Sequence, residues 1–307
     1  MADRQSPFPL DRAPEDVRKL MAEIGPVWGK NIPKHREMTL AAYGPLLARA
    51  PKDRVKVTRD AAYGAHPRQV VDVFQPDAAR NVPVMIFVHG GAFVRGDKRV
   101  SDEVYDNVLY YLARQGVLGL NIEYRLAPES RHPGGARDVA DAVAWAEREA
   151  PGYGGDPTRI YIMGHSAGGT HVATWAFDRT VIPERPKSVA GVILASARVR
   201  ADVLPDNPNA DAVRAYFGDD TSLYEARSPV THANDPNLPM FIAIAEFENP
   251  YLDVYGAELL HRLSLVRKRA PRFLRLTRHN HISLVAHFNT EEDIFGREIL
   301  DFIEQGR

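Results

Sequence analysis

Short apolar segments that alternate with helical patterns limit the possible folds of this chain more than any other feature. The apolar segments are of the kind buried on both faces of a sheet, and helical patterns lie between most of them. The expected strands are 83–90, 117–125, 159–164, 189–196, 239–246 and 272–277, and the expected helices are 101–115, 135–150, 166–178, 252–266 and 290–305. Such alternation predicts an α/β fold with a mostly parallel sheet covered by helices.

Three further segments add to this core. VKVTRD (55–60) and QVVDVFQ (69–75) alternate apolar with polar residues, which predicts a strand pair at one sheet edge. Before them, helical stretches at 14–24 and 35–49, the second broken at Gly44-Pro45, predict a small N-terminal helical cap over residues 1–50. Residues 51–307 would then form the catalytic domain. Within it, the polar segment 199–238 is expected to be a loop with short helices, and 199–224 is a candidate second cap.

The composition excludes several kinds of protein. A formal net charge of -1 argues against binding to nucleic acid or to an anionic membrane surface. The chain has no cysteine, which excludes disulfides and thiolate catalysis and fits a cytoplasmic location. Neither a signal-peptide core nor a long apolar span is recognisable, and no metal-ligand or nucleotide-binding motif occurs, so no cofactor is expected.

The stretch IYIMGHSAGGTH (160–171) contains the pattern G-x-S-x-G at Gly164 to Gly168. It lies between a predicted strand and a predicted helix, which is the context that a nucleophile elbow requires. Small residues beside the serine allow the chain to turn sharply with the serine at the apex. Ser166 is therefore the candidate nucleophile.

A second pattern, HGGAF (89–93), directly follows another predicted strand. Glycines at such a position allow backbone N–H groups to approach a ligand oxygen closely. Ester cleavage requires donors placed where negative charge develops on the carbonyl oxygen. The expected oxyanion hole consists of the N–H groups of Gly90, Gly91 and Ala167.

Together with EYRLAPE (123–129), these motifs make the chain resemble the hormone-sensitive-lipase-like esterases of the α/β-hydrolase fold. The resemblance extends over residues 53–305, and the first 50 residues resemble the cap of that family. It implies a mostly parallel, eight-stranded sheet flanked by helices. The chain departs from the family at His165, where aspartate is usual, and at Ala92, where a third glycine is common.

Two other parts of the family pattern are interpreted structurally. Arg125 and Glu129 of EYRLAPE are expected to brace a loop and not to contact substrate. Asp138 is expected to cap a helix or to form an ion pair. His89 is expected to hold the oxyanion loop by hydrogen bonds.

The serine needs a base and an orienting carboxylate, which follow it in the order acid, then histidine. The family places its acid after the strand that corresponds to PMFIAIA, and Glu248 is the preferred match there; Asp253 and Glu246 remain alternatives. Of the 11 histidines, His279 and His281 lie in the loop where the base belongs, and the family pattern favours His281. His287 is a weaker candidate.

These residues predict a serine hydrolase that cleaves a small-molecule carboxylic ester through an acyl-enzyme. Two rivals remain: an amidase, formamidase or carbamate hydrolase with the same triad, and a non-catalytic small-molecule receptor on the same fold. Trp28, Met38, Tyr43 and Leu47 would either line a substrate pocket or pack the cap against the core. The resemblance further implies a homodimer.

Overall fold

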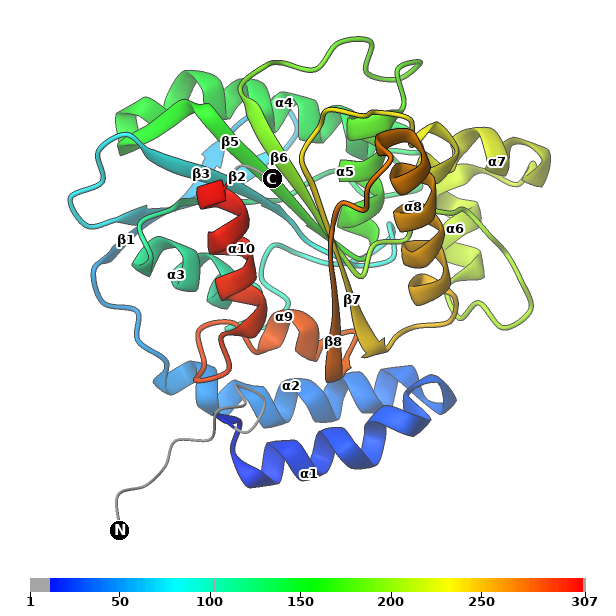
Figure 1. The fold of residues 1–307 in the computed structure, drawn as a ribbon, viewed down its shortest axis with the longest axis horizontal. Helices are drawn as coiled ribbons and strands as arrows, with labels where there is room; N and C mark the ends of the chain where they lie inside the picture. The colour runs from blue at the N-terminus through cyan, green and yellow to red at the C-terminus, as the bar shows by residue number, and fades with distance from the viewer. Residues whose placement is uncertain (1–11, 102, 306–307) are drawn as a thin grey trace.

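An eight-stranded sheet forms the centre of the computed structural model, which describes residues 12–101 and 103–305 (Figure 1). The strand order is β1-β2-β4-β3-β5-β6-β7-β8. The pairs β1–β2 and β2–β4 are antiparallel and all other pairs are parallel, so the predicted sheet and its hairpin at one edge are confirmed. The strands are β1 (Val55–Ala62), β2 (Val70–Pro76), β3 (Val82–Val88), β4 (Leu118–Ile122), β5 (Gly155–His165), β6 (Val189–Ala195), β7 (Met240–Phe247) and β8 (Arg272–Asn280).

Both faces of the sheet are buried, as the continuous apolar segments predict. In β3, Val84 and Ile86 belong to one apolar cluster, whereas Met85 and Phe87 belong to the other. The first cluster includes residues of α4, α5 and α8, and the second includes residues of α3, α9 and α10. These helices are α3 (Asp106–Arg114), α4 (Gly134–Glu149), α5 (Ala167–Phe177), α8 (Leu252–Arg267), α9 (Ser283–Ala286) and α10 (Ile294–Gln305), with the 3-10 turn η3 (Ala150–Tyr153) after α4.

The N-terminal segment packs against the end of the sheet. Its elements α1 (Glu15–Ile24), η2 (Gly25–Lys30) and α2 (Ile32–Arg49) cross the ends of β7 and β8 (Figure 1). Residues 1–11 of the expected cap lie outside the described residues. The expected break at Gly44-Pro45 is wrong, because α2 continues through Pro45. Tyr43 and Leu47 on either side are buried against the core, and this packing offsets the hydrogen bond that a proline removes.

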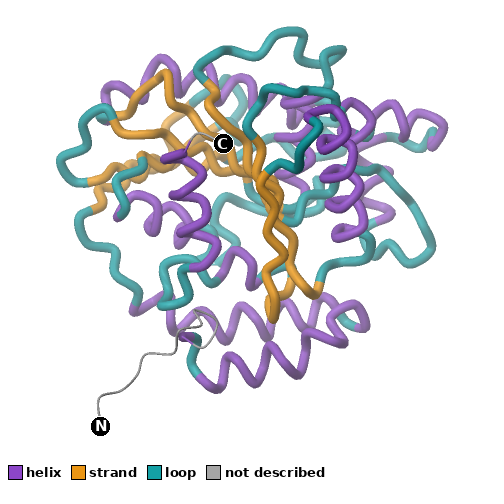
Figure 2. Tube along the Cα trace, in the orientation of Figure 1, coloured by secondary structure: helices purple, strands orange, loops and turns teal. Residues whose placement is uncertain are grey.

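The segment after β6 is a loop with short helices, as predicted (Figure 2). Its elements are α6 (Ala210–Phe217), η4 (Thr221–Leu223), α7 (Tyr224–Arg227) and η5 (Pro229–His232). They lie beside α8 (Figure 1), and Val213, Tyr216 and Phe217 form a small apolar cluster with Phe93 from the loop after β3. The segment therefore adds one wall beside the carboxyl ends of the strands. Within the described ranges, no helix is both long enough and apolar enough to cross a membrane.

Candidate active site

The carboxyl ends of three neighbouring strands bring the motifs together. Val88 at the end of β3 pairs in register with Gly164 of β5, and His165 of β5 pairs with Ala195 at the end of β6. The loop that follows β3, the elbow that follows β5 and Ser196 after β6 therefore meet at one edge of the sheet. Ligand sites of open α/β sheets occupy this edge.

The elbow has the strained geometry that its sequence predicts. Ser166 has φ 54° and ψ −120°, outside the regions where most residues with a side chain lie. A Cβ at Gly168 would stand 2.2 Å from the carbonyl oxygen of Val88, and one at Gly164 would stand 2.7 Å from the carbonyl oxygen of Gly168. Only glycine fits at either position, which explains the G-x-S-x-G pattern.

Ser166, His281 and Glu248 form a continuous chain of hydrogen bonds. The Oγ of Ser166 lies 3.0 Å from Nε2 of His281, and Nδ1 of His281 lies 2.7 Å from Oε2 of Glu248. An ionised carboxylate only accepts hydrogen bonds, so Nδ1 carries a proton and Nε2 accepts from the serine hydroxyl. This tautomer allows His281 to remove the proton of Ser166.

Two donors fix the other oxygen of Glu248. The backbone N–H of Ala245 donates to Oε1 at 2.8 Å, and the hydroxyl of Ser196 donates to the same atom. The two alternative acids lie elsewhere. Glu246 accepts the N–H of Arg278 at 2.6 Å, and Asp253 is exposed near the start of α8.

The two alternative bases are buried away from Ser166. Nδ1 of His279 lies 3.1 Å from the Ser283 hydroxyl, and Nδ1 of His287 donates to the carbonyl of Ser283 at 2.9 Å. Burial lowers the pKa of His279 well below its usual value and that of His287 to about 4, so both rings are neutral near pH 7. Of the candidate bases, only His281 has a hydrogen bond to the serine among the described residues.

The predicted oxyanion donors lie around Ser166. The N–H groups of Gly91 and Ala167 donate no hydrogen bond to another described residue, whereas the N–H of Gly90 is directed at the hydroxyl of Tyr105. A Cβ at Gly91 would stand 1.9 Å from the carbonyl oxygen of Arg95. Gly91 therefore allows the loop to close tightly beside Ser166.

Sequence reasoning missed a second series of polar contacts, which lies behind Ser166 and His281. The hydroxyl of Tyr105 donates to Nδ1 of His165 at 3.1 Å, and Nε2 of His165 donates to the backbone carbonyl of His281 at 3.0 Å. The ring of His165 also packs 4.8 Å from the ring of His281, centroid to centroid. This residue, where the family usually has aspartate, links the elbow to the backbone of the proposed base.

His89, Arg125 and Asp138 have the structural roles that are expected from the sequence. His89 is fully buried, with Nδ1 2.6 Å from the carbonyl of Gly90 and Nε2 2.8 Å from Glu123. Arg125 binds the buried Asp138 through several hydrogen bonds, the shortest 2.6 Å, which confirms the predicted ion pair.

Curated proteins with similar sequences are esterases. A family model described as BD-FAE matches residues 71–180. Esterase LipC of Mycobacterium tuberculosis is 41% identical over 113 residues, which are 36% of this chain and 27% of LipC. Carboxylesterase NlhH of the same species is 36% identical over 195 residues, 58% of this chain and 60% of NlhH. The matches thus span less than two thirds of either relative.

The solved structure of a bacterial heroin esterase covers 97% of this chain, and the chain covers 99% of it, with a TM-score of 0.71 and 24% identity. At that identity the likeness establishes the fold alone. The chain has the α/β-hydrolase fold. The fold that the three motifs imply is thereby confirmed, and the esterase names of LipC and NlhH agree with the family resemblance.

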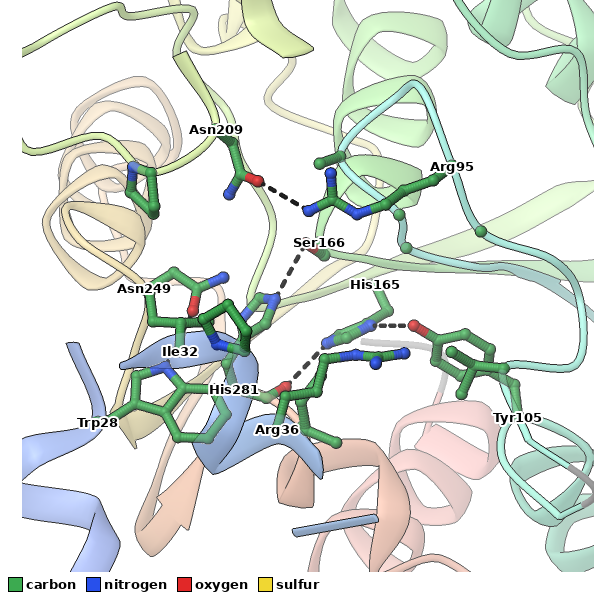
Figure 3. A pocket seen from close by; sticks show the side chains of 18 residues that line it. Trp28, Ile32, Arg36, Arg95, Tyr105, His165, Ser166, Asn209, Asn249 and His281 are labelled. Carbon is green, nitrogen blue, oxygen red and sulfur yellow. Dashed lines mark hydrogen bonds between the residues drawn. The ribbon is translucent and has the colours of Figure 1, made fainter. Parts of the chain in front are cut away.

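A pocket of about 410 Å³ opens beside Ser166 in this α/β-hydrolase (Figure 3). Trp28 and Ile32 of the N-terminal segment form one wall, and Nε1 of Trp28 donates to Oδ1 of Asn249 at 2.9 Å. Tyr43 and Leu47, by contrast, belong to the core. The described lining residues are Trp28, Ile32, Pro33, Arg36, Gly90, Gly91, Ala92, Arg95, Gly96, Val100, Tyr105, His165, Ser166, Pro208, Asn209, Asn249, His281 and Ile282.

Proposed function

We propose that this α/β-hydrolase cleaves small carboxylic esters through an acyl-enzyme on Ser166. The observation that carries the proposal is the hydrogen-bonded series Ser166, His281 and Glu248, whose serine end opens into the pocket. The esterase names of its curated relatives support the same reaction.

In the proposed mechanism, Ser166 Oγ attacks the ester carbonyl while His281 Nε2 takes the hydroxyl proton. Glu248 stabilises the resulting imidazolium through Nδ1. The N–H groups of Gly91 and Ala167 stabilise the charged carbonyl oxygen, and each such donor is worth about 3–4 kcal/mol of barrier. Gly90 can add a third donor if its N–H exchanges the Tyr105 hydroxyl for the oxyanion.

His281 then returns the proton to the departing alcohol, which leaves the acyl group on Ser166. A water molecule enters, gives a proton to His281 and attacks the acyl carbonyl. Collapse of the second tetrahedral intermediate releases the acid and restores the serine hydroxyl. No cofactor takes part in this sequence.

The size of the pocket supports short substrates. About 410 Å³ lies near the lower end of the range for small-molecule sites, and Trp28 and Ile32 bound it on the side of the N-terminal segment. The family resemblance and the cysteine-free composition further support a homodimer and a cytoplasmic location as part of the proposal. Neither is needed for the mechanism.

Initial rates on p-nitrophenyl esters from acetate to laurate test this proposal. We expect hydrolysis that is fastest for acyl chains of about six carbons or fewer, because longer chains exceed the pocket. The matching p-nitroanilides should react at least 100-fold more slowly, since the amine is a worse leaving group. Faster turnover of the anilides would indicate an amidase, and binding without turnover of either series would indicate a receptor.

A further inference from the structure

The charged residues that the structure describes in the lining of the pocket beside Ser166 are all of one sign. Among the described lining residues, only Arg36 and Arg95 carry a permanent charge, and none is an aspartate or glutamate. The carboxylate of Glu248 lies behind His281, where its two oxygens are occupied by His281, Ala245 and Ser196. The described lining therefore carries a net positive charge, although the chain as a whole carries a formal net charge of -1.

Arg36 extends from α2 and is half-buried, yet it has no ion pair with a described carboxylate. Other partly buried arginines of this chain do have such partners. Arg59 lies 2.7 Å from Asp72, and Arg200 lies 2.5 Å from Glu258. A guanidinium that faces a pocket without a described counterion favours an anionic ligand.

Arg95 approaches the pocket from another wall, on the loop after β3 (Figure 3). Its guanidinium donates to the neutral Oδ1 of Asn209 at 3.1 Å, and no described carboxylate neutralises it. Its backbone N–H donates to the carbonyl of Gly91 at 3.1 Å, so Arg95 is tied to the oxyanion loop. Most of its five N–H donors remain available to a ligand.

We propose that the ester substrate carries a carboxylate, which Arg36 and Arg95 bind in the pocket beside Ser166. This inference rests on the proposed esterase function and narrows its substrate class. Suitable substrates are half-esters of dicarboxylic acids or esters of hydroxy acids. Guanidinium groups bind carboxylates with two parallel hydrogen bonds, which would also orient the ester toward the nucleophile.

Two matched pairs of esters test the proposal. p-Nitrophenyl hydrogen adipate and p-nitrophenyl hexanoate have acyl chains of equal length and differ in a terminal carboxylate. 4-Acetoxybenzoate and 4-methylphenyl acetate place the same difference on the alcohol side. For at least one pair, we expect kcat/KM for the ester with the carboxylate to be tenfold or more higher than kcat/KM for its neutral partner at low ionic strength. The ratio of the two kcat/KM values should fall as sodium chloride is raised, because salt screens the attraction.

The variants Arg36→Met and Arg95→Met remove one charge each while keeping an unbranched apolar chain. We expect each to lower the ratio severalfold, and the double variant to lower it at least tenfold. Arg49→Met is the matched control, since Arg49 is exposed at the far end of α2 and does not line the pocket. It should leave the ratio within twofold of that of the parent protein.

A preference for the acid in only one pair would support the proposal and show which side of the ester carries the carboxylate. Neutral esters that react as fast as their acids in both pairs, or a ratio insensitive to salt, would overturn it while leaving the esterase function intact. The kcat/KM ratio and its dependence on salt are both measured on the parent protein, so they test the proposal even if a variant fails to fold. A failure to hydrolyse any of the four esters would overturn the esterase function, and the inference with it.

Discussion

Glu248→Gln is expected to lower kcat for p-nitrophenyl butyrate by about 10³- to 10⁴-fold with little change in the fold. The amide has one acceptor oxygen, and the N–H of Ala245 and the hydroxyl of Ser196 both donate to the Oε1 position. The oxygen of the glutamine will therefore occupy that position and leave its NH₂ facing Nδ1 of His281. His281 must then accept at Nδ1 and carry its proton on Nε2, which is the wrong tautomer for removing the proton of Ser166.

Glu246→Gln and Asp253→Asn are matched controls for this variant. Glu246 lies 3.4 Å from the Arg275 guanidinium, and Asp253 is exposed. Each control should retain kcat within about threefold, since surface substitutions of this kind have small effects. A larger loss in Asp253→Asn than in Glu248→Gln would mean that the orienting carboxylate is Asp253.

Acidification from pH 7 to pH 4.5 is expected to destabilise the protein by several kcal/mol. Burial lowers the pKa of His171 to about 3 and that of His287 to about 4, and it also holds the pKa values of His165 and His279 well below the usual value. Because each folded pKa is lower than the unfolded value of about 6.5, the unfolded chain binds more protons as the pH falls. The stability that these histidines contribute is complete above pH 6.5 and is lost below it.

Two pH units below 6.5, His171 and His287 each lower the free energy of unfolding by about 3 kcal/mol, which together is a large part of the total stability of a typical domain. His165 and His279 act in the same direction. Glu292 acts in the opposite direction, because burial raises its pKa to about 7. Ionisation of Glu292 destabilises the folded state above pH 4.5. Acidification to pH 4.5 therefore raises the free energy of unfolding by about 3 kcal/mol through this residue.

Urea unfolding between pH 7.5 and pH 4.5 measures this pH dependence. His287→Asn should reduce the slope by about 1.4 kcal/mol per pH unit, whereas His261→Asn, at an exposed position, should not change it. A free energy of unfolding that stays constant down to pH 4.5 would contradict the assignment of the buried histidines as neutral.

Local patterns in the sequence predict most of this fold, because each apolar segment that is buried on both faces has to lie inside a sheet. They also predict the elbow, since the clash of any side chain at Gly168 with the carbonyl of Val88 restricts that position to glycine. The predicted helix break at Gly44-Pro45 is wrong because that prediction also rests on a local pattern alone. A local helix-breaking signal gives no information about the packing of Tyr43 and Leu47 that keeps α2 continuous.

Contacts between residues distant in the sequence could not be predicted in this way. The hydroxyl of Ser196 donates a hydrogen bond to Glu248, and the hydroxyl of Tyr105 donates one to His165. Neither Ser196 nor Tyr105 lies in a sequence motif that predicts such a contact. The pocket likewise combines Arg36 of α2 with Arg95 of the oxyanion loop. Such pairs become visible only when the strand order and the position of the N-terminal segment are known.

The central claim, that Ser166 is the nucleophile of an acyl-transfer reaction, is tested most directly by covalent labelling. The protein is incubated with a p-nitrophenyl alkylphosphonate, which traps an activated serine by displacement of p-nitrophenolate, and its peptides are analysed by mass spectrometry. We predict one equivalent of label, located on Ser166, with loss of esterase activity in step with labelling and no label in Ser166→Ala. Stoichiometric label on another residue, or full activity after Ser166 is modified, would contradict the account.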